Sequence, residues 1–351
     1  MFSKLFTHEE QLTYDDVLII PRRTTIRSRQ DVDLTTNLGA SFLKYPVMSA
    51  AMDTVTGGEM AEALDRVGAM GVVHRFQSVE DRIESISPYC YSSEAVGIAV
   101  GLDETEEEIH KLSEVADVIA LDVAHAHADY VIERTRQLSN LLTNWNGQLM
   151  VGNIVTRQAA WELIEAGADI LKVGIGGGSA CSTRIVTGMG YPNISAIIEV
   201  RTAITDHNHG KGTMLVADGG IRNSGDIAKA IAAGADCVML GGLLAGCDES
   251  PGELVSKQYP HEDEKQKMFR GMASKSAQED WKGGLKEWTV AEGVTSYVDA
   301  TGPVKDTVEN LMGGLRSAFT YADAKTIKEF QKNTQFVRVT ANCLSESKPR
   351  V

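Results

Sequence analysis

Apolar residues fall into short runs separated by longer stretches with the spacing of amphipathic helices. The runs have the length and composition of buried parallel strands. They are Tyr45–Ala50, Ala69–His74, Ala95–Val100, Val118–Val123, Leu149–Ile154, Ile170–Ile175, Met214–Asp218 and Cys237–Gly241. The predicted helices between them are Gly58–Val67, Val79–Ile86, Glu106–Val115, Ala128–Leu142, Arg157–Ala166, Ile194–Asp206 and Ser224–Ala233. Several helices end in Gly-Ala-Asp, which stops a helix before the next strand.

Eight strand–helix units predict a TIM (β/α)8 barrel formed by residues 1–351 as a single domain. A doubly wound parallel sheet is the alternative. The count of eight favours the barrel, as do the polar residues at nearly every strand end. In a barrel those ends form one face, which carries the active site.

The alternation of strand and helix patterns is interrupted between about residues 256 and 301, where a charged segment precedes a glycine-rich one. Long irregular connections of this kind are often lids, so we expect a flap here. A final helix, Thr307–Ser317, and a C-terminal extension from Ala324 to Val351 follow. We expect the polar end, Leu344–Val351, to be frayed.

Composition narrows the possible partners. The formal net charge of −14 argues against non-specific binding to nucleic acid or to an anionic membrane surface. The sequence contains no run approaching the roughly 18 apolar residues of a membrane span, and residues 1–10 show no signal-peptide pattern. Five scattered cysteines without metal-site spacing indicate a reduced, cytoplasmic protein.

The most informative segment is the glycine-dense loop Gly174–Arg184, which directly follows a predicted strand and contains Cys181. Backbone N–H groups and the nearby Arg184 favour the thiolate, the nucleophilic form of cysteine. The alternative is an ordinary strand-to-helix turn that happens to carry a small residue. Glycine pairs also follow the last two predicted strands, at Gly219-Gly220 and Gly241-Gly242. TIM barrels commonly bind phosphate there, so we expect a phosphorylated small molecule beside Cys181.

Several motifs together resemble the IMP dehydrogenase/GMP reductase family. They are Tyr14-Asp15-Asp16-Val17, Ser49–Val55, Lys172–Arg184, Thr187–Pro192, Asp218-Gly219-Gly220, Met239–Gly242 and Gly313–Ser317. The resemblance runs nearly end to end. It implies that Cys181 bonds covalently to C2 of a purine, while Thr183 and Glu292 transfer the proton.

Three features place the resemblance closer to the reductase branch. The second and third predicted strands are about one helix apart, so no regulatory domain is inserted between them. The flap is short and lacks the Arg-Tyr pair with which the dehydrogenases activate water. The segment from Phe319 to Thr340 also resembles the reductases. The implied reaction is the NADPH-dependent reductive deamination of GMP to IMP and ammonia, within purine salvage.

The resemblance also assigns binding residues. The substrate residues are Asp218, Gly219, Gly220, Gly241, Gly242, Gly271, Met272, Ser274, Ala291 and Gly293. The cofactor residues are Ser28, Arg29, Arg75, Asp122, Val123, Ala124, Asn153, Ile175 and Gly176, with Ser317 and Thr320 reaching the cofactor of a neighbouring subunit of a homotetramer. The carbonyls of Gly176, Gly178 and Cys181 would bind a monovalent cation, potassium.

Three positions depart from the family pattern: Gly177 stands where proline is usual, Trp288–Ala291 replaces a segment with arginine, and Arg75 replaces lysine. They leave open whether the reductant is NADPH or NADH, and whether the substrate is a ribo-, deoxy- or modified guanylate. Two further functions stay open: an IMP dehydrogenase that makes XMP with NAD, and a non-catalytic nucleotide sensor.

Overall fold

Eight parallel strands form the centre of the protein. The computed structural model describes residues 10–39, 41–86, 95–207, 212–257 and 263–348. The strand order is β4-β11-β10-β9-β8-β7-β6-β5, and the sheet closes where β4 meets the chain just before β5. There Ser49 N donates to Met70 O (2.9 Å) and Met70 N donates to Val47 O (3.1 Å). The predicted (β/α)8 barrel is therefore confirmed.

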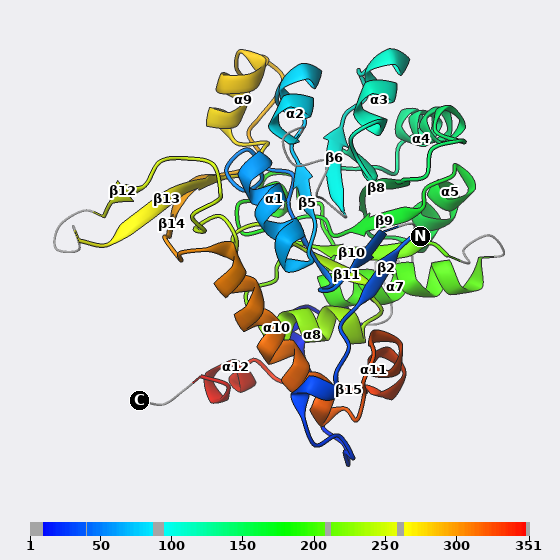
Figure 1. Ribbon diagram of the computed structural model, residues 1–351, viewed down its shortest axis with the longest axis vertical. Helices are drawn as coiled ribbons and strands as arrows, with labels where there is room; N and C mark the ends of the chain where they lie inside the picture. The colour runs from blue at the N-terminus through cyan, green and yellow to red at the C-terminus, as the bar shows by residue number, and fades with distance from the viewer. Residues whose placement is uncertain (1–9, 40, 87–94, 208–211, 258–262, 349–351) are drawn as a thin grey trace, which may run out of the picture.

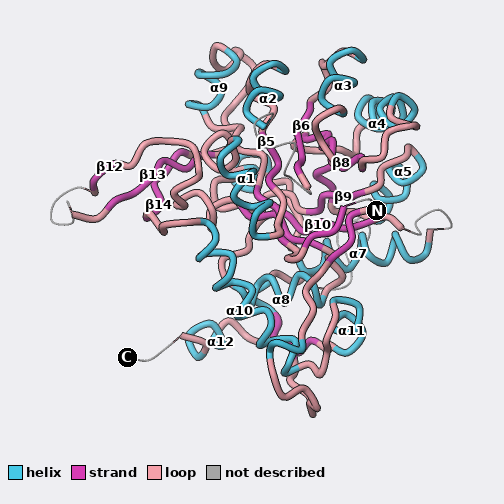
Figure 2. The backbone as a smooth tube through the Cα atoms, viewed as in Figure 1, coloured by secondary structure: helices cyan, strands magenta, loops and turns pink. Residues whose placement is uncertain are grey.

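Each barrel strand lies within a predicted run or differs from it by a residue or two. The strands are β4 (Val47–Ser49), β5 (Gly71–Val73), β6 (Val96–Val100), β7 (Val118–Asp122), β8 (Gln148–Ile154), β9 (Ile170–Val173), β10 (Met214–Asp218) and β11 (Cys237–Leu240). Helices surround the sheet (Figures 1 and 2). They are α1 (Gly58–Val67), α2 (Val79–Ile86), α3 (Glu106–Ser113), α4 (Asp129–Leu141), α5 (Arg157–Glu165), α7 (Asn193–Asp206) and α8 (Ser224–Ala232). The short α6 (Thr183–Thr187) is an extra turn after the cysteine loop.

Two apolar cores follow from the alternation of side chains along each strand. One fills the barrel interior with Met48, Val72 and Met150, and the other lies between the strands and the helices. The hairpin of β2 (Thr36–Leu38) and β3 (Ser41–Leu43) adds Leu38 and Leu43 to the interior core. Because these leucines cluster with residues at the first positions of the strands, the hairpin closes the amino-terminal end of the barrel. The opposite end is left for the site.

The flap region is more ordered than the sequence suggested. The strands β12 (Val255–Ser256), β13 (Lys265–Arg270) and β14 (Thr295–Asp299) form a three-stranded antiparallel sheet that projects from the barrel (Figure 1). The helix α9 (Lys275–Lys282) lies between β13 and β14 in the chain, and Figure 2 shows it near α2.

The chain ends also hold structure that hydrophobic periodicity did not predict. The strand β1 (Val17–Ile19) pairs antiparallel with β15 (Phe336–Arg338). The final helix, α10 (Val304–Tyr321), extends beyond its predicted bounds, and α11 (Ile327–Asn333) follows it. The prediction that Leu344–Val351 frays was wrong in its first part, since Leu344 lies in α12 (Asn342–Glu346). Residues 349–351 lie outside the described residues. Among the described helices, none has the length and apolar character needed to cross a membrane.

Candidate active site

Cys181 lies where the loop after β9 meets the flap. An antiparallel bridge joins it to Gly293, and Val294 N donates to Ala180 O (3.0 Å). Ser182 N donates to the backbone oxygen of Glu292 at 3.0 Å. Two segments more than a hundred residues apart thus pair through their backbones, and the flap residue Glu292 is held against the cysteine loop.

The side chains of Cys181, Thr183 and Glu292 form a continuous hydrogen-bonded chain. The Cys181 thiol lies 3.2 Å from Thr183 Oγ1, and the Thr183 hydroxyl donates to Glu292 Oε2 at 2.9 Å. A nucleophile, a hydroxyl and a carboxylate in contact form a path along which a proton can move. The structure brings together all three residues that the resemblance named as catalytic.

Exposure distinguishes Cys181 from the other described cysteines. Cys181 is exposed, whereas Cys237 and Cys247 are buried and Cys343 is intermediate. Burial raises the pKa of the Cys237 and Cys247 thiols above the usual range, so both stay protonated and unreactive. Cys90 lies outside the described residues. Among the described cysteines, Cys181 is therefore the one presented for reaction.

Two glycines allow the flap to approach the cysteine loop closely. A Cβ on Gly271 would lie 2.8 Å from Ala180 O, and a Cβ on Gly293 would lie 2.9 Å from Ser274 N. Ser274 caps α9 by accepting from Ala277 N. Both glycines were predicted as substrate residues, and their position shows that they also permit the backbone pairing that places Glu292.

A second polar cluster spans the carboxyl ends of four adjacent strands. Lys172 Nζ lies 2.6 Å from Asp122 Oδ1 and 3.6 Å from Asp218 Oδ2. Asn153 Nδ2 donates to the same Asp218 oxygen at 2.7 Å and to Gly174 O at 2.6 Å. The register shift between β8 and β9 at Gly152/Ile154 coincides with Asn153. Lys172 was not among the predicted site residues.

Burial and charge act in opposite directions on Lys172. Burial alone lowers the pKa of its ammonium group, but the attraction of Asp122 and Asp218 outweighs it, and the pKa lies above its ordinary value. Lys172 is therefore charged at neutral pH. The cluster holds one cation between two carboxylates.

The residues predicted to bind the dinucleotide lie in two places. Arg75 Nε donates to Asp122 O (3.0 Å), and at the ends of β7 and β8 Asn153 N donates to Val123 O (2.9 Å) while Val123 N donates to Gly152 O (3.0 Å). Ala124 follows directly, and Ile175 O accepts from Arg184, next to Gly176. Ser28 and Arg29, in contrast, lie at a short 3-10 helix (Arg29–Asp31) that packs against α10, the helix of Ser317 and Thr320. Within one chain, this second group is separate from Asp122.

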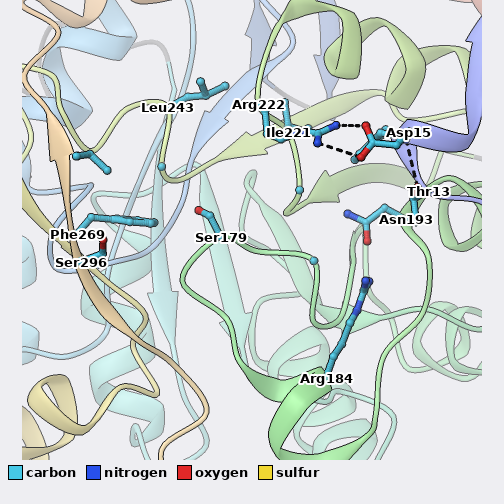
Figure 3. A pocket seen from close by; sticks show the side chains of 15 residues that line it. Thr13, Asp15, Ser179, Arg184, Asn193, Ile221, Arg222, Leu243, Phe269 and Ser296 are labelled. Atoms are coloured by element: carbon cyan, nitrogen blue, oxygen red, sulfur yellow. Dashed lines mark hydrogen bonds and ion pairs between the residues drawn. The ribbon is translucent and has the colours of Figure 1, made fainter. Parts of the chain in front are cut away.

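A pocket of about 510 Å³ opens beside the cysteine loop (Figure 3). The predicted residues Gly220 and Gly242 line it, and Asp218, Gly219 and Gly241 adjoin them in the chain. The lining also includes Ser179, Arg184, Asn193 and Arg222, none of which was among the predicted binding residues. Such a mixture of glycine backbone, hydroxyl and guanidinium groups suits a phosphate.

Arg222 fixes one wall of the pocket. It pairs with Asp15 (Nη1 to Oδ2, 3.1 Å) and with Asp226 (Nε to Oδ2, 3.1 Å), and Figure 3 shows the Asp15 pair. Since Arg222 lies in the loop between β10 and α8, the double pairing holds that loop. On another wall, Asn193 Nδ2 donates to Gly219 O (2.6 Å), while its buried Oδ1 has no hydrogen-bond partner among the described residues. Asn193 and Arg184 point toward one another (Figure 3).

The remaining predicted substrate residues lie on the flap side. Met272 Sδ accepts from Asp53 N at 3.3 Å, so Met272 contacts the loop after β4. Ala291 directly precedes Glu292, whose backbone N–H donates to Ala273 O (3.0 Å). The carbonyls proposed for a cation are in the loop as expected, and Gly178 O accepts from Cys181 N (3.1 Å).

Comparison with known proteins bears on this geometry. The family model described as "IMP dehydrogenase / GMP reductase domain" matches residues 11–350. The chain belongs to this family. A GMP reductase of Onchocerca volvulus is 37% identical over 95% of this chain and 92% of its own length. Those of Ascaris suum and of Escherichia coli (strain K12 / DH10B) are 38% and 39% identical, covering 95% and 94% of this chain and 94% and 95% of their own.

The donor set beside Asp122 fits the dinucleotide that this family implies. Arg75 supplies a cation for a phosphate, and the Asp122 carboxylate supplies an acceptor for ribose hydroxyls, with Oδ1 fixed by Lys172. Both lie at the same end of the barrel as the exposed Cys181.

Proposed function

We propose that the protein is a GMP reductase that converts GMP and NADPH, with one proton, to IMP, ammonia and NADP⁺. The observation that carries the proposal is the contact chain from Cys181 through Thr183 to Glu292. The similarity of the protein to proteins named GMP reductase supports the same reaction. A binding protein would have no need of an exposed thiol joined to a carboxylate.

The chemistry follows from the leaving group. Amide ion is a poor leaving group, so direct displacement at C2 of the purine is slow. The Cys181 thiolate adds to C2, the Thr183–Glu292 pair delivers a proton to the exocyclic amine, and ammonia departs, leaving a thioimidate. When bound, the nicotinamide supplies a hydride for this carbon. Cys181 then leaves with the C–S electron pair, which regenerates the thiolate and yields IMP.

The other residues of the site are proposed to bind the nucleotide. The glycine loops around Gly220 and Gly242, with Ser179, suit the 5′-phosphate. Asp218 suits the ribose hydroxyls, because one of its oxygens already accepts from Asn153 and the other remains for the ligand. The finer parts of the proposal are NADPH as reductant, potassium at the loop carbonyls, a cytoplasmic homotetramer and a role in purine salvage.

Mass spectrometry of the protein with GMP and NADPH tests the reaction, with Cys181→Ala as the control. The proposal expects IMP and ammonia from the wild type, loss of NADPH in equal amount, and no IMP from the variant. XMP formed from IMP and NAD would instead make the protein a dehydrogenase. No turnover in either assay would point to an altered guanylate or to nucleotide sensing.

A further inference from the structure

Lys172 is a cation in the wall of the barrel. It interrupts the apolar strand β9 between Leu171 and Val173, and only 5% of it is exposed. A buried ammonium group is costly unless its charge is paired and its hydrogen bonds are made. Neither the covalent step nor the proton path from Glu292 uses this group. Its presence therefore needs another explanation.

The partners of Lys172 lie on both sides of its own strand. Asp122 ends β7 and Asp218 ends β10, so one ammonium group reaches carboxylates that come from strands flanking β8 and β9. Each carboxylate keeps about a fifth of its side-chain surface exposed (22% and 23%), whereas the lysine side chain keeps 7%. The carboxylates face the mouth, and the lysine lies behind them.

The two carboxylates belong to different ligands in the proposed function. Asp218 faces the nucleotide, and Asp122 faces the dinucleotide. A group in contact with both can transmit the state of one ligand site to the other, provided that its interaction with the two is shared. Lys172 is such a group, since its single positive charge interacts with both carboxylates.

We propose that Lys172 is a positioning residue that joins the nucleotide and dinucleotide sites by holding Asp218 and Asp122 in the orientation in which they accept from their ligands. The inference rests on the proposed function, because it uses the ligands assigned there. Without the ammonium group, Asp122 Oδ1 and Asp218 Oδ2 lose the cation that lies 2.6 Å and 3.6 Å from them, and both carboxylates can rotate. A rotated carboxylate is a poorer acceptor for ribose hydroxyls, so both ligands lose affinity.

The test compares Lys172→Met with Lys172→Arg by direct calorimetric binding of GMP and of NADPH. Methionine keeps most of the length and removes the charge, whereas arginine keeps the charge. Lys172→Met should weaken both ligands by about tenfold to hundredfold, the effect of leaving charged acceptors unpaired. Lys172→Arg should restore most of the affinity for both. The thermal midpoint of each variant checks folding, and Lys172→Gln is a second neutral variant.

Asp122→Asn supplies the matched comparison. Loss of the Asp122 carboxylate should weaken the binding of NADPH. The affinity for GMP should stay within about threefold of wild type, since Lys172 then pairs with Asp218 alone.

The outcomes separate the two proposals. A wild type that does not bind GMP overturns the proposed function and this inference with it. A wild type that binds both ligands, beside neutral variants that bind them equally well, overturns the inference alone. A loss confined to one ligand also overturns it, because a shared cation must affect both.

Discussion

The guanidinium of Arg270 and the carboxylate of Asp53 form a buried ion pair that ties the flap to the loop after β4. Arg270 Nε lies 3.0 Å from Asp53 Oδ2, and Trp281 Nε1 of α9 donates to the same oxygen at 2.8 Å. Arg270 directly precedes the turn that contains Ala273, whose carbonyl accepts from Glu292 N. The ion pair therefore fixes the backbone from which Glu292 reaches Thr183.

Asp53→Asn should destabilise the protein by about 3 kcal/mol, because it leaves the buried Arg270 guanidinium without its main counter-charge. Asp280→Asn is the matched control. Asp280 pairs with the same guanidinium (2.6 Å), but 59% of its side chain is exposed, so its loss should cost less than about 1 kcal/mol. Urea unfolding followed by circular dichroism gives both free energies. Equal losses would mean that the buried pair does not anchor the flap.

Thr183→Val should lower the rate of ammonia release by about 10²- to 10⁴-fold, the usual contribution of a positioned proton-transfer group. Valine matches the shape of threonine and removes the hydroxyl between Cys181 and Glu292. Thr183→Ser keeps the hydroxyl and should stay within about tenfold of wild type. Rapid-quench measurement of ammonia in a single turnover gives the rates. A fast valine variant would show that Glu292 acts without the hydroxyl.

His74 should make stability fall in mild acid. Burial, opposed by Asp53 and reinforced by Arg82 and Arg270, lowers the pKa of His74 from 6.5 to about 4. Between these values the unfolded chain binds a proton that the native protein does not. The contribution of neutral His74 to the free energy of unfolding is therefore complete above about pH 6.5. It is lost as pH falls, by about 1.4 kcal/mol per pH unit and about 3 kcal/mol by pH 4.

His74→Asn isolates this effect, because asparagine can still accept from Phe76 N, as His74 Nδ1 does at 3.3 Å. The free energy of unfolding of both proteins is measured from pH 4 to 7.5. We expect the difference between them to change with a slope of about 1.4 kcal/mol per unit below pH 6.5. Parallel curves would mean that His74 titrates normally in the native state.

Gly177→Pro, which introduces the residue usual in the family, should weaken nucleotide binding here. A Cβ at position 177 would lie 2.7 Å from Asn193 Nδ2 and Oδ1, so Asn193 would have to move and lose its bond to Gly219 O. The cost should be smaller in an Asn193→Ala background, where the clash is absent. A double-mutant cycle on GMP affinity measures the coupling, expected at about 0.5–3 kcal/mol. Additive effects on GMP affinity would mean that residues 177 and 193 act independently.

The barrel could be predicted from the sequence because its strands are buried on both faces. Runs such as Ala95–Val100 then stand out as continuous apolar segments between helical patterns. The flap strand Lys265–Arg270 could not be predicted this way, because only Met268 and Phe269 in it are apolar and they are adjacent, so it shows neither an apolar run nor an alternation. Its two buried cations are satisfied by distant partners: Lys267 Nζ donates to the carbonyls of Cys247, Asp248 and Ser250, and Arg270 pairs with Asp53.

The candidate site was predictable where local chemistry shows itself. A cysteine among glycines after a strand is a local signal, and so are glycine pairs at strand ends. Asn193 gave no local signal, because its significance depends on partners from other loops. Lys172 gave one indication, its place inside an apolar strand: a charge that cannot reach water must have a counter-charge nearby.

The pairing of β1 with β15 has a consequence for synthesis of the protein on the ribosome. Val17–Ile19 emerges before all eight barrel strands, yet its partner Phe336–Arg338 emerges after them. Ile20 N likewise donates to Gln335 O. The first strand must therefore wait, with its hydrogen-bonding edge unpaired, while the whole barrel is made. Closure of this ladder is a step that cannot finish until every barrel strand has been synthesised.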